Sequence, residues 1–358
     1  MRALCWYGKE DVRVETVADP AILAPRDAIL RVTAAGICGS DLHLYAGLVP
    51  GMRIGDILGH EIVGEVVETG KAAKGLERGA RVLVPFAISC GRCAYCRGEL
   101  WSLCDNSNPN AEMAERLYGQ AGAGALGFSH LFGGYAGGQA EYVRVPFADT
   151  NAFPVPDRIS DDQAVLVTDS FPAGYMAAEA CGIAPGDTVA VWGCGPVGIF
   201  AIVSSSLLGA ARVIAIDETR ERLVLAERLG AEVLNAHEED VLERLRDLTS
   251  GQGPDACIEA VGMEAPLSPL LSFYDRAMKS AGVGTDRGSA LSEAVRACRK
   301  GGTVSVAGFY CGAGDGVPLG AAYTKGLTIK MGPAHVPRCA RQELARASTP
   351  ERWTRPSS

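Results

Sequence analysis

Four cysteines lie close together in the first half of the chain and could share one metal ion. They follow the spacing Cys-x2-Cys-x2-Cys-x7-Cys at Cys90, Cys93, Cys96 and Cys104. Four thiolates satisfy a tetrahedral zinc and leave no position open, which is typical of a structural site. An iron–sulfur cluster is one alternative, but the ferredoxin spacing continues with x3-Cys-Pro, whereas here the gap is seven residues and Asp105 follows. A zinc ribbon that contacts nucleic acid is the other. We predict a structural zinc.

A second set of metal-binding residue types precedes this cluster. Cys38 opens the run Cys-Gly-Ser-Asp-Leu-His that ends at His43, and Gly59-His60-Glu61 follows. A Cys and a His this far apart are a weak signal, because a lone His is more often a surface or core residue. The longer string 59–64, with Gly70 and Ala73 beyond it, strengthens the interpretation.

A glycine-rich turn later in the chain has the spacing of a dinucleotide-binding fingerprint. Gly193, Gly195 and Gly198 form Gly-x-Gly-x-x-Gly directly after the apolar segment 188–192, and Asp217 ends the next apolar segment, 19 residues after Gly198. The glycines allow a tight turn and a close approach of the backbone to the pyrophosphate. Asp217 would accept hydrogen bonds from the adenine ribose.

The residues around this turn favour NAD over NADP. Pro196 and Val197 open a helix whose N-terminus would take the pyrophosphate. Glu218 adds negative charge beside Asp217 and would repel a 2′-phosphate, whereas Arg220 and Arg222 leave NADP open. Val261 and Gly262 follow a third apolar segment, at the place where this kind of fold passes near the nicotinamide ribose.

The elements that must position these residues fall into two domains. A chain of 358 residues exceeds the usual size of one hydrophobic core. Residues 1 to about 150 alternate short β-rich runs (12–17, 27–34, 62–69, 81–85, 140–145) with turns, and 105–138 read as an insertion. From about 170, strands and helices alternate, which indicates a doubly wound parallel sheet.

Composition excludes other classes. Lys+Arg 34 against Asp+Glu 42 gives a net charge of −8 with no basic block, so nucleic acid is not expected as a partner. The N-terminus lacks the apolar stretch of a signal peptide, so clustered Cys are expected to bind metal rather than form disulfides. The uncharged run 188–211 contains Gly and Pro and splits into strand, turn and helix, so no membrane span is expected.

With these motifs the chain resembles the zinc-dependent medium-chain alcohol dehydrogenase superfamily over roughly 1–335. Within it, the run 133–142, the insertion before it and Thr168-Asp169-Ser170-Phe171-Pro172 resemble the glutathione-independent formaldehyde dehydrogenase branch. The resemblance implies an α/β protein: a GroES-like β-barrel catalytic domain over 1–153 and a Rossmann NAD-binding domain over 154–334. Residues 335–358 depart from the family, are Arg- and Ser-rich, and are predicted to be a disordered tail.

The resemblance also implies a catalytic zinc held by Cys38, His60 and Asp169, with a fourth position open for water or substrate. One thiolate, one neutral imidazole and one carboxylate cancel the charge of Zn²⁺. Glu61 is expected behind the metal. Asp41 is expected to orient His60.

Ser40 and His43 lie two and five residues beyond Cys38. The same resemblance implies that the proton passes from Ser40 to the nicotinamide ribose and then to His43. Phe86 and the glycine-rich insertion are expected in the pocket wall. Arg222 matches a position that lies against the cofactor in this branch, so it does not require a phosphate.

The expected activity is hydride transfer from a zinc-bound primary alcohol or hydrated aldehyde, formaldehyde in particular, to NAD. Two zinc ions per chain, a small alcohol or aldehyde substrate, a homo-oligomer and a cytoplasmic location complete the expectation. The alternative is a zinc- and NAD-binding protein without turnover, in which the atypical C-terminal segment leaves the catalytic domain incomplete.

Overall fold

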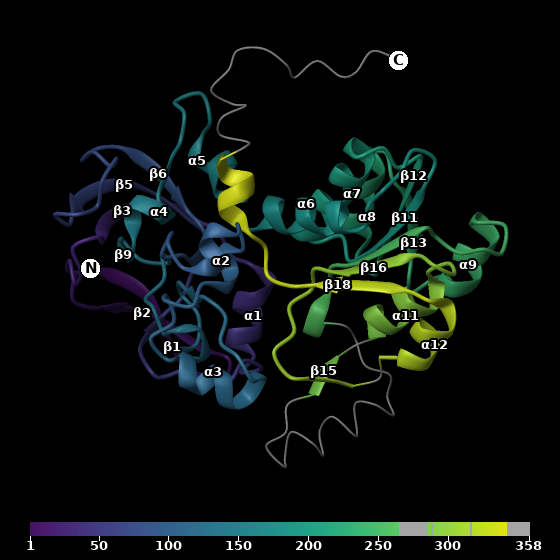
Figure 1. Cartoon of the computed structure of the whole chain (residues 1–358), viewed down its shortest axis with the longest axis horizontal. Coiled ribbons are helices and arrows are strands. Elements are labelled where there is room, and N and C mark those ends of the chain that lie inside the picture. The colour runs from purple at the N-terminus through teal and green to yellow at the C-terminus, as the bar shows by residue number, and fades with distance from the viewer. Residues whose placement is uncertain (265–284, 288, 316, 342–358) are drawn as a thin grey trace. The chain divides into compact units, whose positions relative to one another are not determined.

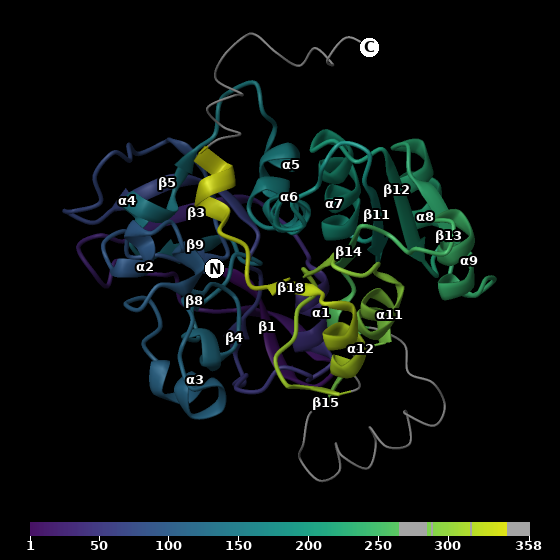
Figure 2. The same cartoon turned by 45° about the vertical axis from the view of Figure 1, so that its right-hand side comes forward.

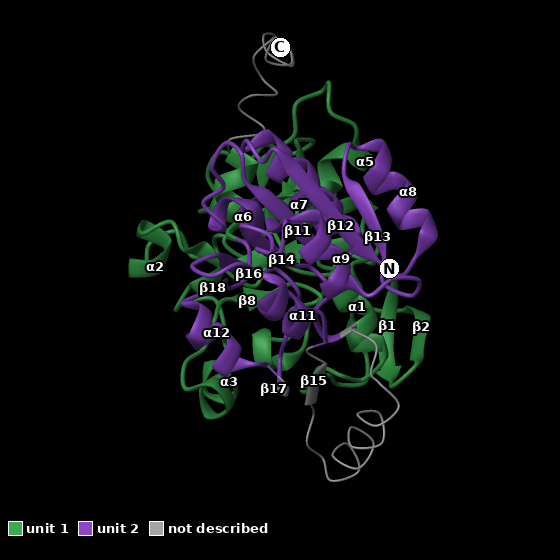
Figure 3. Cartoon of the chain, turned by 90° about the vertical axis from the view of Figure 1, so that its right-hand side faces the viewer, with its two compact units in different colours: residues 1–172, 335–358 green, residues 173–334 purple. Residues whose placement is uncertain are grey.

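The computed structural model describes residues 1–264, 285–287, 289–315 and 317–341. The chain divides into two compact units, residues 1–172 with 335–358, and residues 173–334 (Figure 3). This division falls after Pro172, later than the domain boundary expected at 153/154. Residues 155–167 account for the difference, because Val155 and Ala164 pack with Val63 and Leu83 of the first unit.

The first unit is built mainly from antiparallel strands (Figure 1). Its five-stranded sheet has the order β10-β6-β5-β3-β9, and a three-stranded sheet has the order β2-β1-β4. The strands are β1 (Arg2–Gly8), β2 (Asp11–Thr16), β3 (Ala28–Ala35), β4 (Asp56–Ile57), β5 (Ile62–Thr69), β6 (Arg81–Val84), β9 (Tyr142–Val145) and β10 (Phe153–Pro154). Short β7 (Ala87–Ile88) and β8 (Gly124–Ala125) pair with each other. This is the β-rich architecture that the sequence indicated.

The first unit also contains short helices; among the candidate metal residues, Cys38 and Cys93 are N-caps of two of them and Cys96 lies within one. The helices are α1 (Gly39–Tyr45), α2 (Ala94–Arg97), α3 (Ala111–Tyr118), α4 (Ala148–Asn151) and α5 (Asp161–Ala164). The expected insertion 105–138 contains α3 and β8. Its Leu126, Phe128 and Leu131 are buried, so this segment contributes to the core of the unit.

The second unit holds a six-stranded parallel sheet with the order β13-β12-β11-β14-β16-β18. Figure 2 labels these strands except β16. Its strands are β11 (Thr188–Trp192), β12 (Arg212–Asp217), β13 (Glu232–Asn235), β14 (Ala256–Glu259), β16 (Thr303–Val306) and β18 (Thr328–Met331). The chain moves outward from β11 to β13, then returns to the other side of β11 at β14. Ligands of such sheets bind at this reversal, outside the carboxyl ends of the strands.

Helices cover both faces of this sheet because side chains alternate along each strand. On β11, Val189 and Val191 pack with α6 (Ser170–Ala180), α7 (Pro196–Leu207) and α8 (Arg220–Arg228). Ala190 and Trp192 pack on the opposite face with α9 (Val241–Leu248), α11 (Ser289–Ala297) and α12 (Leu319–Lys325). A two-stranded sheet of β15 (Thr285–Arg287) and β17 (Ala313–Asp315) completes the described part of the unit.

Residues 335–341 differ from the disordered tail that the sequence predicted. Residues 336–341 are helical, and Ala340 is fully buried against the cluster that contains Val63 and Phe153. The Arg341 guanidinium lies 5.2 Å from the ring centroid of Trp101. The rest of the predicted tail, 342–358, lies outside the described residues.

The uncharged run 188–211 divides into β11 and α7, as expected. Within the described ranges, every helix is too short or too polar to cross a membrane.

Candidate functional site

Cys38 occupies the N-cap of α1, which fixes where its thiol lies. The N-cap has extended backbone (φ −90°, ψ 159°), and a capping box joins it to Asp41. The Asp41 Oδ2 atom accepts the Cys38 amide at 2.9 Å. Cys38 is thereby held at the start of α1.

His60 lies just before β5, and Asp41 reaches it as well. The other Asp41 oxygen, Oδ1, lies 3.2 Å from His60 Nδ1. The second ring nitrogen, Nε2, lies 3.4 Å from Asp169 Oδ2. Because Nδ1 faces Asp41, Nε2 is the nitrogen directed toward the other candidate ligands. One carboxylate therefore orients two candidate ligands, Cys38 and His60.

Asp169 directly precedes α6 and lies with Glu61 in the same group. Donor atoms of Cys38, His60, Glu61 and Asp169 all lie within 4.8 Å of one another. The Ser170 hydroxyl donates to Glu61 Oε1 at 3.2 Å and so fixes the carboxyl beside the group. The ligands expected from the sequence and the expected neighbour Glu61 are brought together.

The electrostatics of this group suit a cation. Burial raises the pKa of Glu61 to about 7, and the nearby Asp169 charge adds to the rise. Burial lowers the pKa of His60, but Asp41, Asp169 and Cys38 outweigh it and raise this pKa well above its usual range. Burial and Asp169 raise the pKa of the Cys38 thiol. Thiol, imidazole and carboxylate within one buried cluster are a zinc donor set, and a divalent cation would balance their charge.

Ser40 and His43, the expected proton-transfer residues, both lie on α1. The Ser40 Oγ atom lies 3.4 Å from His60 Nε2, at the edge of the donor group. His43 is buried one helical turn further along. Their relay stays a prediction.

Aromatic rings enclose the His60 side. Phe86 and Phe128 meet the imidazole edge-on, with centroids 6.4 and 5.8 Å away, and Phe132 packs on Phe128. Phe86 was expected in the pocket wall. Phe128 and Phe132 come from the 105–138 insertion, whose glycine-rich part was also expected in the pocket wall, but the sequence did not single out these two residues. A Phe-rich run after a metal-ligand motif is the signal that could have found them.

Cys90, Cys93, Cys96 and Cys104 converge in a buried lobe of the first unit. The Sγ atoms of Cys90 and Cys96 are 4.0 Å apart, and those of Cys93 and Cys104 are 3.9 Å apart. A tetrahedron with Zn–S bonds of ~2.3 Å requires about 3.8 Å between sulfurs, so the lobe fits zinc.

Backbone amides support these thiolates. The amides of Arg92 and Cys93 donate to Cys90 Sγ, and the amide of Cys96 donates to Cys93 Sγ. The Asn106 side chain also donates to Cys90 Sγ at 3.4 Å. Donors of this kind stabilise the anionic form that a metal requires.

The fingerprint turn of the second unit uses its glycines in different ways. Gly193 has φ +86°, and a Cβ there would lie 2.8 Å from Val261 Cγ2. A Cβ on Gly198 would collide with the Gly193 carbonyl oxygen. Gly195 is the N-cap of α7 and faces open space, so none of the described residues excludes a side chain there. A turn left open at a helix N-terminus fits a pyrophosphate, with Pro196 and Val197 in the first helical turn.

Asp217 is the last residue of β12, and its carboxylate accepts a hydrogen bond from the fingerprint turn. Its Oδ2 accepts the Cys194 amide and its Oδ1 accepts the Thr219 amide, each at 2.7 Å. The Arg222 guanidinium lies 3.8 Å from Asp217 Oδ2. The acidic residue and the arginine singled out in the sequence are therefore neighbours at the end of β12.

Val261 and Gly262 follow β14 and are held by a buried carboxylate. The Oε1 atom of Glu259 accepts the amides of Val261 and Gly262 at 2.7 and 2.6 Å. Glu259 was not singled out in the sequence, where it was one residue of an apolar strand.

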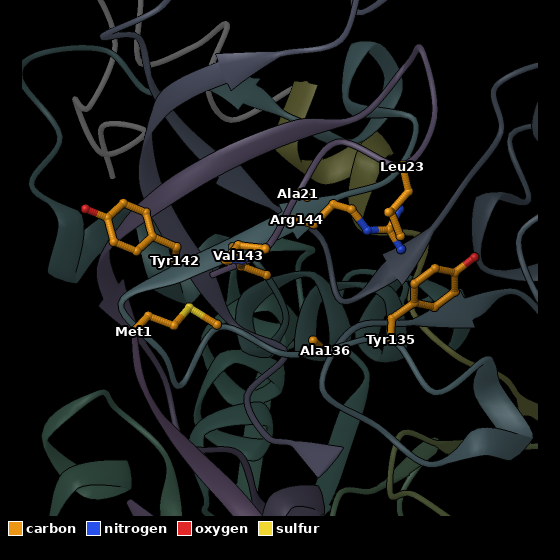
Figure 4. A pocket seen from close by; sticks show the side chains of 9 residues that line it. Met1, Ala21, Leu23, Tyr135, Ala136, Tyr142, Val143 and Arg144 are labelled. Carbon is orange, nitrogen blue, oxygen red and sulfur yellow. The ribbon is translucent and has the colours of Figure 1, made fainter. Parts of the chain in front are cut away.

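Two cavities lie away from these residues. One, of about 260 Å³, is in the first unit near Met1, Tyr135, Tyr142 and Arg144 (Figure 4). Its Arg144 pairs with Asp27 at 2.9 Å. The other, of about 210 Å³, is in the second unit around Cys298 and Lys325. Neither contains a predicted site residue.

Comparison with known families identifies two matching models. Residues 24–157 match the alcohol dehydrogenase GroES-like domain, and residues 196–290 match the zinc-binding dehydrogenase model.

Individual proteins match over most of the chain. A zinc-type alcohol dehydrogenase-like protein AdhB of Bacillus subtilis, itself described as uncharacterized, is 41% identical over 94% of this chain and 86% of its own. The glutathione-independent formaldehyde dehydrogenase of the same organism is 32% identical over 92% and 80%. Among solved structures, alcohol dehydrogenase TADH from Thermus sp. ATN1 aligns with a TM-score of 0.79 and 36% identity, over 96% of this chain and 88% of that one.

Proposed function

The chain belongs to the zinc-dependent medium-chain alcohol dehydrogenase superfamily, and from that premise we propose that it transfers hydride from a primary alcohol or hydrated short aldehyde to NAD. The observation that carries this proposal is the donor group of Cys38, His60, Glu61 and Asp169, gathered within 4.8 Å.

Cys38, His60 and Asp169 would hold a catalytic zinc, and Glu61 would remain behind it. When bound, zinc supplies Lewis-acid polarisation of the substrate oxygen through the coordination position that the protein leaves open. Asp41 keeps the thiol and the imidazole in place through its two oxygens. The four cysteines of the 90–104 lobe would hold a second, structural zinc.

Proton removal is the task we assign to Ser40 and His43. The Ser40 hydroxyl lies at the edge of the donor group, 3.4 Å from His60 Nε2. It would take the proton of the substrate hydroxyl and pass it toward His43. Imidazole is the side chain most often used for proton transfer in enzymes, which suits the final acceptor.

NAD is the proposed hydride acceptor. The open turn at Gly195 and the helix N-terminus at Pro196 and Val197 would take the pyrophosphate. Asp217 and Glu218 would face the adenine ribose and disfavour a 2′-phosphate. Arg222 lies 3.8 Å from Asp217, which offsets its attraction for that phosphate. Val261 and Gly262 would border the nicotinamide ribose.

A small substrate is favoured by the aromatic rings around His60. Phe86 and Phe128 pack on the imidazole and narrow the space near the donor group. The similarity to a formaldehyde dehydrogenase supports formaldehyde as a candidate. We further propose that the protein is a homo-oligomer, which light scattering would test. We also propose a cytoplasmic location.

The test is NADH formation by the zinc-loaded protein with short primary alcohols and with formaldehyde. We expect turnover with at least one of them and a preference for NAD over NADP. Substitution Asp169→Ala removes one proposed ligand and is expected to reduce kcat at least about 100-fold. A zinc-loaded protein that turns over none of these substrates would sink the proposal, and an unchanged rate in the Asp169→Ala variant would refute that ligand.

A further inference from the structure

Glu259 is a buried carboxylate at the heart of the second unit. It is the last residue of β14, which lies between β11 and β16 in the parallel sheet. Its relative exposure is 0%. Burial raises its pKa, against the opposing effect of the Gly262 and Val261 amides and the Tyr310 hydroxyl. A carboxyl group in such a position is unfavourable unless its interactions compensate for the lost hydration, so its contacts need a reason.

Glu259 joins two loops that leave neighbouring strands. Its Oε1 atom accepts the amides of Val261 and Gly262, in the loop after β14. Its main-chain oxygen accepts the amides of Ala307 and Gly308, in the loop after β16, at 2.8 and 3.0 Å.

The two loops are in contact with each other as well. The Met263 amide donates to the Phe309 oxygen at 3.2 Å. A Cβ on Gly262 would lie 2.6 Å from the Phe309 nitrogen, and a Cβ on Gly308 would lie 2.5 Å from Glu259 Oε2. The side chain of Glu259 thus sets how closely these loops approach.

The loop after β14 also borders the fingerprint turn. The Ala260 amide donates to the Trp192 oxygen at 2.8 Å, directly before Gly193. A Cβ on Gly193 would lie 2.8 Å from Val261 Cγ2. A shift of Val261 would therefore alter the space beside the glycine turn.

We propose that Glu259 is a positioning residue for the nicotinamide half of the dinucleotide, acting through the loops at 260–262 and 307–309. This rests on the proposed NAD binding. Both loops leave the carboxyl ends of the two strands beyond the reversal point, on the opposite side of β11 from Asp217. In a doubly wound sheet the adenine half lies on the Asp217 side, and the second half of the dinucleotide lies across the reversal.

The test compares two probes on the full-length protein. NADH engages both halves of the site, whereas AMP engages only the adenine half. Substitution Glu259→Leu removes the acceptor while keeping a buried side chain of similar length. We expect it to weaken NADH binding about tenfold and to leave AMP binding within about twofold, because the lost hydrogen bonds act on one half only.

Three further variants separate positioning from general loosening. Glu259→Gln keeps an oxygen acceptor and is expected to restore NADH affinity to within about threefold of the original. Gly308→Ala presses on Glu259 Oε2 and the Gly262 amide and is expected to repeat the NADH-selective loss. Cys257→Ala is the matched control, because Cys257 is fully buried two residues earlier on β14 and faces the same side. It is expected to lower the melting temperature without changing NADH affinity.

Each outcome bears on the inference. Equal losses of NADH and AMP affinity in Glu259→Leu, or NADH loss of the same size in Cys257→Ala, would overturn it. So would a Glu259→Gln variant as weak as Glu259→Leu. If Glu259→Leu does not fold, Gly308→Ala carries the test alone, and unchanged NADH binding there would also overturn it. An unsubstituted protein that binds neither probe would instead refute the proposed NAD function.

Discussion

The three fingerprint glycines differ in what requires them. Gly193 and Gly198 have no room for a side chain because Val261 and the Gly193 carbonyl oxygen lie against them. Gly195 has room, so no residue in the part of the chain that the structure describes accounts for its lack of a side chain. In the sequence alone, the three glycines of the motif look equivalent. Only the fold separates two packing requirements from one that points to a ligand.

The sequence also indicated the candidate metal ligands, but not all of the contacts that hold them. Cys38, His60 and Asp169 were proposed from a family resemblance, and the fold gathers them. Asp41 was named as a neighbour of His60, but its second contact, to the Cys38 amide, depends on the α1 capping box. Glu259 could not be found, because one acidic letter at the end of an apolar strand does not show that its side chain is buried.

At the same scale, Glu293 predicts a pH dependence of stability. The Trp192 indole donates to Glu293 Oε2 at 3.1 Å, and burial raises the pKa of Glu293. Because the pKa is raised in the folded protein, the contribution of Glu293 to folding stability is complete below its pKa in the unfolded chain, ~4.3. This contribution is lost as the pH rises through the pKa of the folded protein. The variant Glu293→Gln keeps an acceptor but cannot ionise.

We therefore expect the melting temperature of Glu293→Gln, relative to the original protein, to increase steadily between pH 4 and pH 7. The measurement is a thermal melt at each pH, followed by tryptophan fluorescence. A difference between the two proteins that does not change with pH would contradict the assignment.

At the scale of elements, the strands that flank the fingerprint were the most predictable. The segments 188–192 and 212–217 coincide with β11 and β12, because long apolar runs bounded by Gly and Asp leave few alternatives. Among the elements of the second unit, β13, β18, α9 and α12 were not predicted from the sequence. Strands β13 and β18 have four residues each, and β18 is exposed throughout, so no apolar pattern marks them.

The helix at 336–341 was missed for a different reason. Its few apolar residues lie among arginines, and their burial depends on contacts with residues far away in sequence. Ala340 reaches the cluster of Val63, Leu83 and Phe153, which no local pattern could indicate.

This helix predicts a specific stability effect. Ala340 is fully buried, so Ala340→Leu would overpack the cluster and is expected to lower the free energy of unfolding by about 1–3 kcal/mol. The matched control Arg341→Ala removes a cation–π contact with Trp101 at 5.2 Å and is expected to cost at most about 1 kcal/mol. Urea unfolding of both variants measures the difference. Equal effects would mean that residue 340 does not anchor the helix.

At the scale of the whole molecule, the two cysteine-containing sites should respond differently to metal loss. Cys104 is fully buried, and its thiol lies beside those of its three partner cysteines in a lobe with little regular structure. Cys104→Ala is expected to remove one zinc per chain and to lower the melting temperature, since structural zinc contributes directly to folding. Cys38→Ala is expected to remove the other zinc and to abolish turnover with a smaller thermal effect.

Zinc per chain, measured by atomic emission spectrometry beside thermal melts, tests this. We expect two equivalents in the original protein and one in each variant. A count of one in the original protein, or equal thermal losses in both variants, would contradict the division between a structural and a catalytic site.

The two candidate sites lie in separate stretches of the sequence. Every candidate metal ligand precedes residue 173, and the whole candidate nucleotide turn lies within 173–334. Mutations that retune the nucleotide preference and mutations that retune the substrate can therefore accumulate in different stretches of the gene. Selection, or a laboratory chimera that exchanges 173–334 as one segment, could change the electron carrier while leaving the metal chemistry as it was inherited.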